Sequence, residues 1–193
     1  MLEWPIPKWF GTTEEVTVQK LMEWLANEAQ GFRRVAGYVL LAALVDTALI
    51  HIVRSALINW GVITVPFELH PENPFKYYNV LLFVSILIRA PLFEETIFRF
   101  VPLTLVLFFT KRTTVVLSIV VVFAALFGAI HPYGVIGKAQ VAIAGLVFGV
   151  VFLKCGGLNG RVIKAGLCAI AAHGMANLFI LATEYYDYLE RVL

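Results

Sequence analysis

The chain has 193 residues, of which 60% are hydrophobic and only 15% are charged, and its mean hydropathy is +0.84. A soluble domain is about half apolar and a quarter charged, so this composition excludes a disordered chain, a collagen-like fibre and an ordinary cytosolic enzyme. A net charge of +2, with no dense cluster of Lys and Arg, argues against nucleic acid as a partner. We therefore expect an integral, multi-pass membrane protein whose first partner is the lipid bilayer.

The first predicted element lies in residues 1–34, which we expect to form a separate N-terminal segment. Thr12 and Glu15 match a capping box, and an amphipathic pattern follows them. This is typical of a helix that lies in the membrane interface; a small helix packed on the bundle is the alternative. No basic region leads into an apolar one, so a cleaved signal peptide is not expected. The apolar face comprises Val18, Leu21, Met22, Leu25 and Ala29, and the aromatic anchors are Trp4, Trp9 and Trp24.

Residues 35–193 are predicted to form the transmembrane domain. A span needs about 20 apolar residues, and the apolar runs here do not alternate, so helices are favoured over barrel strands. The predicted fold class is an all-α polytopic bundle of about five to six membrane helices, preceded by the N-terminal amphipathic helix. The predicted spans are Val35–Trp60, Asn79–Phe109, Thr113–Ile130, Ala139–Leu153 and Val162–Thr183.

The second predicted span is longer than one upright helix and contains Pro91 and Pro102. We predict one tilted or broken span, with two half-helices as the alternative, because a single span preserves the asymmetry of basic residues. The positive-inside rule then predicts a cytoplasmic N-terminus and an external C-terminus, in the cell membrane if the source is prokaryotic. The basic residues on the cytoplasmic side would be Lys8, Lys20, Arg33, Arg34, Lys111, Arg112, Lys154, Arg161 and Lys164, against Lys76, Lys138 and Arg191 outside.

Charged side chains near the middle of the second span are costly, at about 2.5–3.5 kcal/mol or more for each charge. Glu95 and Arg99 are four residues apart, in the order that favours an ion pair on one helical face. Glu94 is rotated by about 100° from Glu95, which leaves its carboxylate to face something else. An unpaired buried carboxylate can accept a proton from water, as a general base must. A structural ion-pair network is the alternative.

The later spans carry polar groups as well. His173 and Asn177 share one helical face and could donate to an oxyanion, or simply form hydrogen bonds between helices. His131 follows Phe127 by one turn at the end of the third span, where it either joins the site or faces headgroups. Phe127 is either part of the site or core. One acidic helix and two histidine helices could surround a single water molecule, which is the arrangement of a hydrolase.

These residues form three motifs in order, EExxxR at 94–99, FxxxH at 127–131 and HxxxN at 173–177. Together, over about residues 81–181, they resemble the CPBP family, the CAAX-protease and bacteriocin-processing intramembrane endopeptidases also called Abi. The resemblance implies a glutamate-based hydrolysis of a peptide bond near the membrane. It implies that Glu94 and His131 activate the water, and that His173 and Asn177 stabilise the oxyanion.

The resemblance further implies that Glu95 and Arg99 order the site or hold substrate, and that Phe127 packs beside it. The implied partner is a protein or peptide substrate, and no cofactor is expected. One alternative is a family member that has become an inactive immunity or scaffold protein. Another is a metal-dependent membrane protease, in which two His and two Glu hold zinc or another divalent ion, although HExxH is absent.

A few further residues are assigned to packing. Asp46 and Arg54 lie on roughly one face of the first span, where we expect bundle packing; an exit path or a supporting network is the alternative. Gly145 and Gly149 form a GxxxG pattern that predicts close helix packing. The two cysteines, at positions 155 and 168, are expected to be inert.

Overall fold

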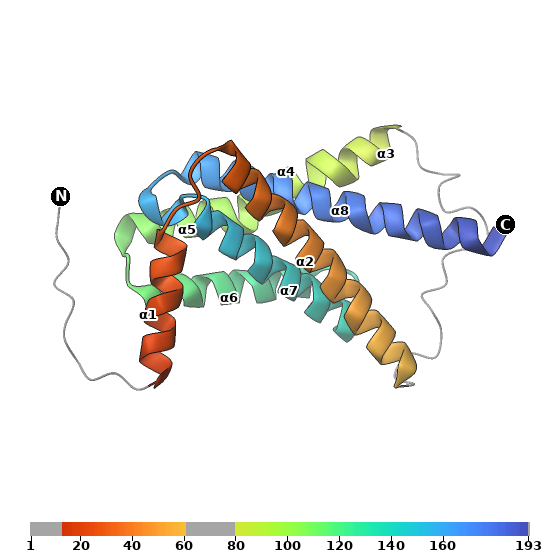
Figure 1. The fold of residues 1–193 in the computed structure, drawn as a ribbon, viewed down its shortest axis with the longest axis horizontal. Helices are drawn as coiled ribbons and strands as arrows, with labels where there is room; N and C mark the ends of the chain where they lie inside the picture. Colours follow the sequence, from red (N-terminus) through yellow and green to blue (C-terminus); the bar gives the residue numbers. More distant parts are fainter. Residues whose placement is uncertain (1–12, 61–79, 193) are drawn as a thin grey trace.

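The computed structural model describes residues 13–60 and 80–192, and within those ranges every regular element is helical (Figure 1). The elements are α1 (Thr13–Ala26), α2 (Phe32–Asn59), α3 (Val80–Val84), η2 (Ser85–Arg89), α4 (Ala90–Glu95), η3 (Thr96–Phe100), α5 (Val101–Phe109), α6 (Thr113–Ile130), α7 (Val135–Lys154), η4 (Gly157–Asn159) and α8 (Val162–Val192).

The described helices are those of a membrane protein, which confirms the predicted fold class. Three of them are long and apolar enough to cross a bilayer, over Phe32–Leu57, Val135–Asn159 and Val162–Tyr186, and Thr114–Ile130 is a shorter apolar helix. Large apolar side chains are exposed on several helices, as expected for surfaces that face lipid and not water. They include Leu41, Leu44, Ile52, Phe93, Ile97, Val101, Leu105, Val121, Val122, Ile163 and Leu167.

The predicted second span is one bent helix from Val80 to Phe109, because the backbone stays helical at every junction from α3 to α5. Two π-helical turns, η2 and η3, interrupt it. In each, a backbone N–H bonds to the carbonyl five residues earlier, Ala90 to Ser85 and Val101 to Thr96. A proline follows each of these donors and has no N–H to continue the pattern, so the bends have an identifiable cause.

Helices α6 and α7 pack closely against each other because small residues face the contact. A Cβ added at Gly149 would lie 2.7 Å from Cγ1 of Val120, and one at Gly145 would lie 3.0 Å from Cα of Ala124. The GxxxG pattern therefore brings these two helices together, as predicted. Helix α2 packs on α7 and α8. Helix α8 packs in turn on α7 and on the bent helix Val80–Phe109, which we call the segmented helix.

Helix α1 lies at one end of the molecule (Figure 1). Its Leu25 is 1% exposed, in a core cluster that includes Phe152 and Leu153 of α7. The alternative of a helix packed on the bundle therefore describes the C-terminal end of α1. The Trp24 ring stands edge-on to Tyr38 of α2 at 6.1 Å. The capping residue and the first two tryptophans that we expected as anchors, Thr12, Trp4 and Trp9, lie outside the described residues.

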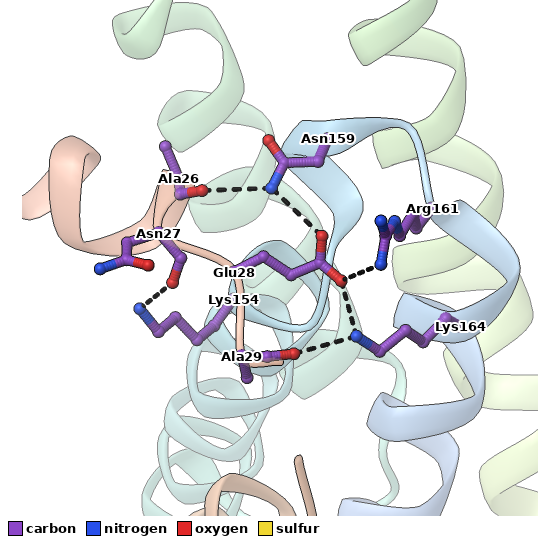
Figure 2. A network of polar contacts seen from close by, with 8 residues as sticks. All are labelled: Ala26, Asn27, Glu28, Ala29, Lys154, Asn159, Arg161 and Lys164. Atoms are coloured by element: carbon purple, nitrogen blue, oxygen red, sulfur yellow. Dashed lines mark hydrogen bonds and ion pairs between the residues drawn. The ribbon is translucent and has the colours of Figure 1, made fainter. Parts of the chain in front are cut away.

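A polar network holds the α1–α2 connection to the end of α7 and the start of α8 (Figure 2). Oε1 of the buried Glu28 accepts from Nζ of Lys164 at 2.6 Å and from Arg161 at 3.2 Å, and Oε2 accepts from Asn159 at 3.4 Å. The hydrogen bond from Lys164 is the main reason that the pKa of Glu28 lies below its ordinary value. Nζ of Lys154 donates to two backbone carbonyls at the end of α1.

Candidate functional site

The segmented helix carries the acidic pair between its two π-helical turns and the arginine in the second turn. Glu94 and Glu95 close α4, and Arg99 follows in η3. The side chains of Glu95 and Arg99 are 0% and 2% exposed, and NH1 of Arg99 donates to Oε1 of Glu95 at 3.1 Å. The spacing predicted this ion pair, and the structure confirms it.

His173 of α8 lies between the two glutamates. Its Nδ1 is 2.9 Å from Oε1 of Glu95, and its Nε2 is 3.7 Å from Oε2 of Glu94. An ionised carboxylate can only accept, so Nδ1 carries the hydrogen that Glu95 receives. Glu95 is thus held by two donors, whereas Glu94 is 27% exposed and, among the described residues, has only the longer contact to His173. The two carboxylates therefore have different environments, as their rotation about the helix predicts.

The Arg99 guanidinium is packed against aromatic rings. Its central carbon is 4.1 Å from the ring centre of Phe127 and 5.8 Å from that of Phe148, distances typical of cation–π contacts. A Cβ added at Gly145 would lie 2.6 Å from NH2 of Arg99, so glycine leaves the room that this group fills. Phe148 also stacks on His173, at 4.8 Å and 16°.

Phe148 is a site neighbour that the motifs do not contain, and Gly145 was assigned to helix packing alone. One sequence pattern could have indicated that both residues lie near the site. Gly145 marks a close approach on α7, and Phe148 lies three residues later, on nearly the same helical face.

His131 caps the C-terminal end of α6 with its backbone N–H and its ring together. Its Nδ1 is 2.7 Å from the carbonyl oxygen of Phe127. Since a carbonyl only accepts, Nδ1 carries the hydrogen, and Nε2 of the neutral ring is left as an acceptor. The ring also stands edge-on to the Phe127 ring at 4.7 Å.

Asn177 bonds to a carbonyl that the segmented helix leaves free. In η2 the next donor after Ala90 would be position 91, but Pro91 has no N–H to offer to Ile86. Nδ2 of Asn177 donates to that Ile86 carbonyl at 2.9 Å. One N–H of the side-chain amide is used in this way, and the second remains.

These side chains meet at a cavity of about 570 Å³ that α2, α6, α7 and α8 enclose. Its volume is within the range of ligand pockets. Glu94, Glu95 and Arg99 are not among the lining side chains and connect with the cavity through His173. The lining includes Asp46, Ile50, Arg54, Phe127, His131, Tyr133, Gln140, Ala144, Phe148, His173, Asn177, Ile180 and Glu184.

The structure thus brings the three motifs to one place. Glu95, Arg99 and His173 are in direct contact, Glu94 faces the same imidazole, and His131 and Asn177 share its cavity. Among the described residues, no group of three or more His, Cys, Asp or Glu side chains is arranged to hold a metal ion.

Comparison with known proteins gives the family. The family model of type II CAAX prenyl endopeptidase, Rce1-like, matches residues 76–179, which is more than half of the chain and contains all three motifs. No curated protein and no solved structure matches the chain significantly. The resemblance on the three motifs and the family match agree. The chain belongs to the Rce1-like family of type II CAAX prenyl endopeptidases, a family of proteases, and is an integral membrane protein.

Proposed function

We propose that the protein is an active intramembrane endopeptidase in which Glu94 and His131 activate a water molecule. The observation that carries the proposal is that His173 contacts both glutamates while one of them, Glu95, is neutralised by Arg99. This leaves the Glu94 carboxylate as the group able to take a proton at the edge of a buried site.

In the proposed reaction, water loses a proton to Glu94 and its oxygen attacks the carbonyl carbon of the scissile bond. His131 holds the water through Nε2, the ring nitrogen that its bond to the Phe127 carbonyl leaves as an acceptor. When the tetrahedral intermediate collapses, the C–N bond breaks and the proton passes from Glu94 to the leaving amine. Water and peptide are consumed, and a carboxylic acid and an amine are formed.

The proposed oxyanion donors are the second N–H of Asn177 and Nε2 of His173. Because Nδ1 of His173 already donates to Glu95, Nε2 can donate only in the form of the ring that carries both protons. Each donor of this kind contributes about 2.7–4 kcal/mol to the stabilisation of a transition state. Every step uses protein side chains and water, and none is routed through a metal.

The test compares Glu94→Gln with Glu23→Gln, which changes an exposed glutamate on α1 whose carboxylate accepts a hydrogen bond from Gln19. Both variants and the wild type are expressed in the same membranes, and new peptide N-termini are mapped by mass spectrometry. We expect Glu94→Gln to lower cleavage by about 10²–10⁴-fold, the usual contribution of a general base, and Glu23→Gln to leave it unchanged.

Cleavage that persists in Glu94→Gln would refute the assignment. A wild type and a Glu94→Gln variant that are equally inert would identify a binding or immunity member of the family. Loss of wild-type cleavage with a chelator, and recovery with zinc, would identify a metal-dependent protease instead.

We also propose that the cavity opens on the external side of the membrane. Its lining includes Arg54, Glu184 and the α6–α7 connection from Tyr133, all at the end of the bundle away from Glu28. The positive-inside rule places the opposite end in the cytoplasm, with the N-terminus. The basic residues at or near that end are Lys20, Arg33, Arg34, Lys111, Arg112, Lys154, Arg161 and Lys164.

This orientation is tested with cysteines introduced singly at Gly134, beside the cavity, and at Asn159, at the basic end. Gly134 has open space around it, and both native cysteines are buried. In intact cells a membrane-impermeant maleimide is expected to label Gly134→Cys, and to label Asn159→Cys only after permeabilisation. The reverse pattern would place the opening in the cytoplasm.

A further inference from the structure

Asp46 of α2 is a buried carboxylate that the proposed mechanism does not use. It is 3% exposed, lies in the middle of the span Phe32–Leu57, and lines the same cavity as His173 and Asn177. Among the described residues, its Oδ1 has no hydrogen-bond partner. Buried polar atoms nearly always have one, and an unpaired charge at this depth is costly.

No described side chain is placed to neutralise this carboxylate at short range. The neighbouring Thr47 donates its hydroxyl to the carbonyl of Ala43 instead. The groups that attract Asp46 electrostatically are His173 and Arg99, but both are already held by the glutamates of the acidic pair. The Asp46 carboxyl therefore faces the cavity without a counter-ion of its own.

Within the part of the chain that the structure describes, the one lysine or arginine that lines the cavity is Arg54, two helical turns further along α2. Eight residues correspond to about 12 Å along a helix axis, so Arg54 stands toward the mouth while Asp46 stands deeper. Ile50 lies one helical turn from each of them on α2, and apolar side chains of other helices, such as Phe148 on α7, line the same cavity. Such a lining suits the methylene stem of a long basic side chain, whose charged end would then reach Asp46.

We propose that Asp46 binds a lysine or arginine side chain of the substrate, next to the scissile bond. This inference rests on the proposed function, because it assigns a subsite of the same cavity. An incoming cation supplies the counter-charge and the hydrogen bond that Oδ1 of Asp46 lacks, so a substrate with a neutral side chain at that position binds less well. Asp46 touches the substrate and not the reacting atoms, so it acts as a specificity residue.

The first experiment uses a library of apolar decapeptides in which each position in turn is lysine or norleucine, which has an uncharged stem. The wild type, reconstituted in phosphatidylcholine vesicles, is expected to prefer lysine at one fixed position relative to the cut, by at least about tenfold in kcat/KM. Asp46→Asn should reduce that preference to near one, mainly through KM. Asp46→Glu should restore part of it, and Glu23→Gln should keep all of it.

A binding experiment separates this subsite from the reaction. Glu94→Gln protein, with and without Asp46→Asn, is immobilised, and retention of the same lysine and norleucine peptides is compared. Preferential retention of lysine peptides that depends on Asp46 supports the subsite even if no cleavage is ever seen. Cleavage by the wild type without a lysine preference, or equal retention of both peptides, overturns it and leaves the proposed function standing.

Discussion

Two adjacent glutamates in this protein share a contact with His173 but have different surroundings. Glu95 is fully buried and receives hydrogens from Arg99 and His173, whereas Glu94 is partly exposed and has one contact at 3.7 Å. A buried ion pair contributes little to net stability while it is intact, but removing one partner leaves an uncompensated charge. Glu95 should therefore matter for folding, and Glu94 for chemistry.

We expect Glu95→Gln to lower the free energy of unfolding by about 3–5 kcal/mol, because Arg99 would keep its buried charge without a counter-ion. Glu94→Gln should change it by less than about 1 kcal/mol, since Glu94 is partly exposed. Both values are obtained from unfolding in the same mixed micelles. Equal destabilisation by the two variants would show that the acidic pair acts as one structural unit.

At the scale of elements, the contact between the segmented helix and α8 depends on a missing backbone donor. Pro91 leaves the Ile86 carbonyl without its helical partner, and Asn177 supplies one. The same face of α8 approaches closely, since a Cβ added at Gly174 would lie 2.5 Å from the Leu87 carbonyl oxygen. The proline, the glycine and the amide thus hold His173 against the acidic pair.

A double-mutant cycle tests this dependence. Asn177→Ala should cost about 1–3 kcal/mol of unfolding free energy, because the partly buried Ile86 carbonyl loses its donor. In a Pro91→Ala background the new N–H at position 91 can serve that carbonyl, so the cost of Asn177→Ala should fall by at least about 0.5 kcal/mol. Pro102→Ala is the matched control at the other π-helical turn. The same cost in all three backgrounds would contradict the account.

At the scale of the whole molecule, the two ends of the bundle differ. One end is closed by the Glu28 network, which ties the α1–α2 connection to α7 and α8 (Figure 2). The other end leads into the cavity through Arg54, Tyr133 and Glu184. The Glu28 network therefore connects the helices at the basic end of the bundle, and the cavity lies toward the other end.

The Glu28 network predicts a pH dependence of stability. Lys164, Asn159 and Arg161 hold the pKa of Glu28 below its ordinary value, so the folded state binds this proton less readily than the unfolded state. The stabilisation is complete above the ordinary glutamate pKa of about 4.3 and is lost as the pH falls through the lower, folded value.

We expect the difference in melting temperature between the wild type and Glu28→Gln to be largest near pH 6 and to shrink at about pH 3.5. Glu23→Gln is the control, since its carboxylate is exposed on α1. A difference that grows as the pH falls would contradict the sign of the linkage.

Much of this architecture could be predicted from the sequence. Long apolar runs predict helices, and a four-residue spacing predicts the Glu95–Arg99 pair, because both depend on local geometry. The partner of Glu94 could not be predicted, since it depends on how α8 crosses the segmented helix. The same holds for Asp46, whose assignment to simple packing left out the cavity that it lines.

The side-chain amide of Asn177 is already hydrogen-bonded in the structure without a ligand. One of its hydrogens bonds to the Ile86 carbonyl, and this bond favours one orientation of the amide and so of its other hydrogen. Binding of a ligand to this donor therefore costs less conformational entropy of the Asn177 side chain. Pro91, which lies 86 residues before Asn177 in the sequence, thereby helps to orient a donor on another helix through the backbone N–H that it lacks.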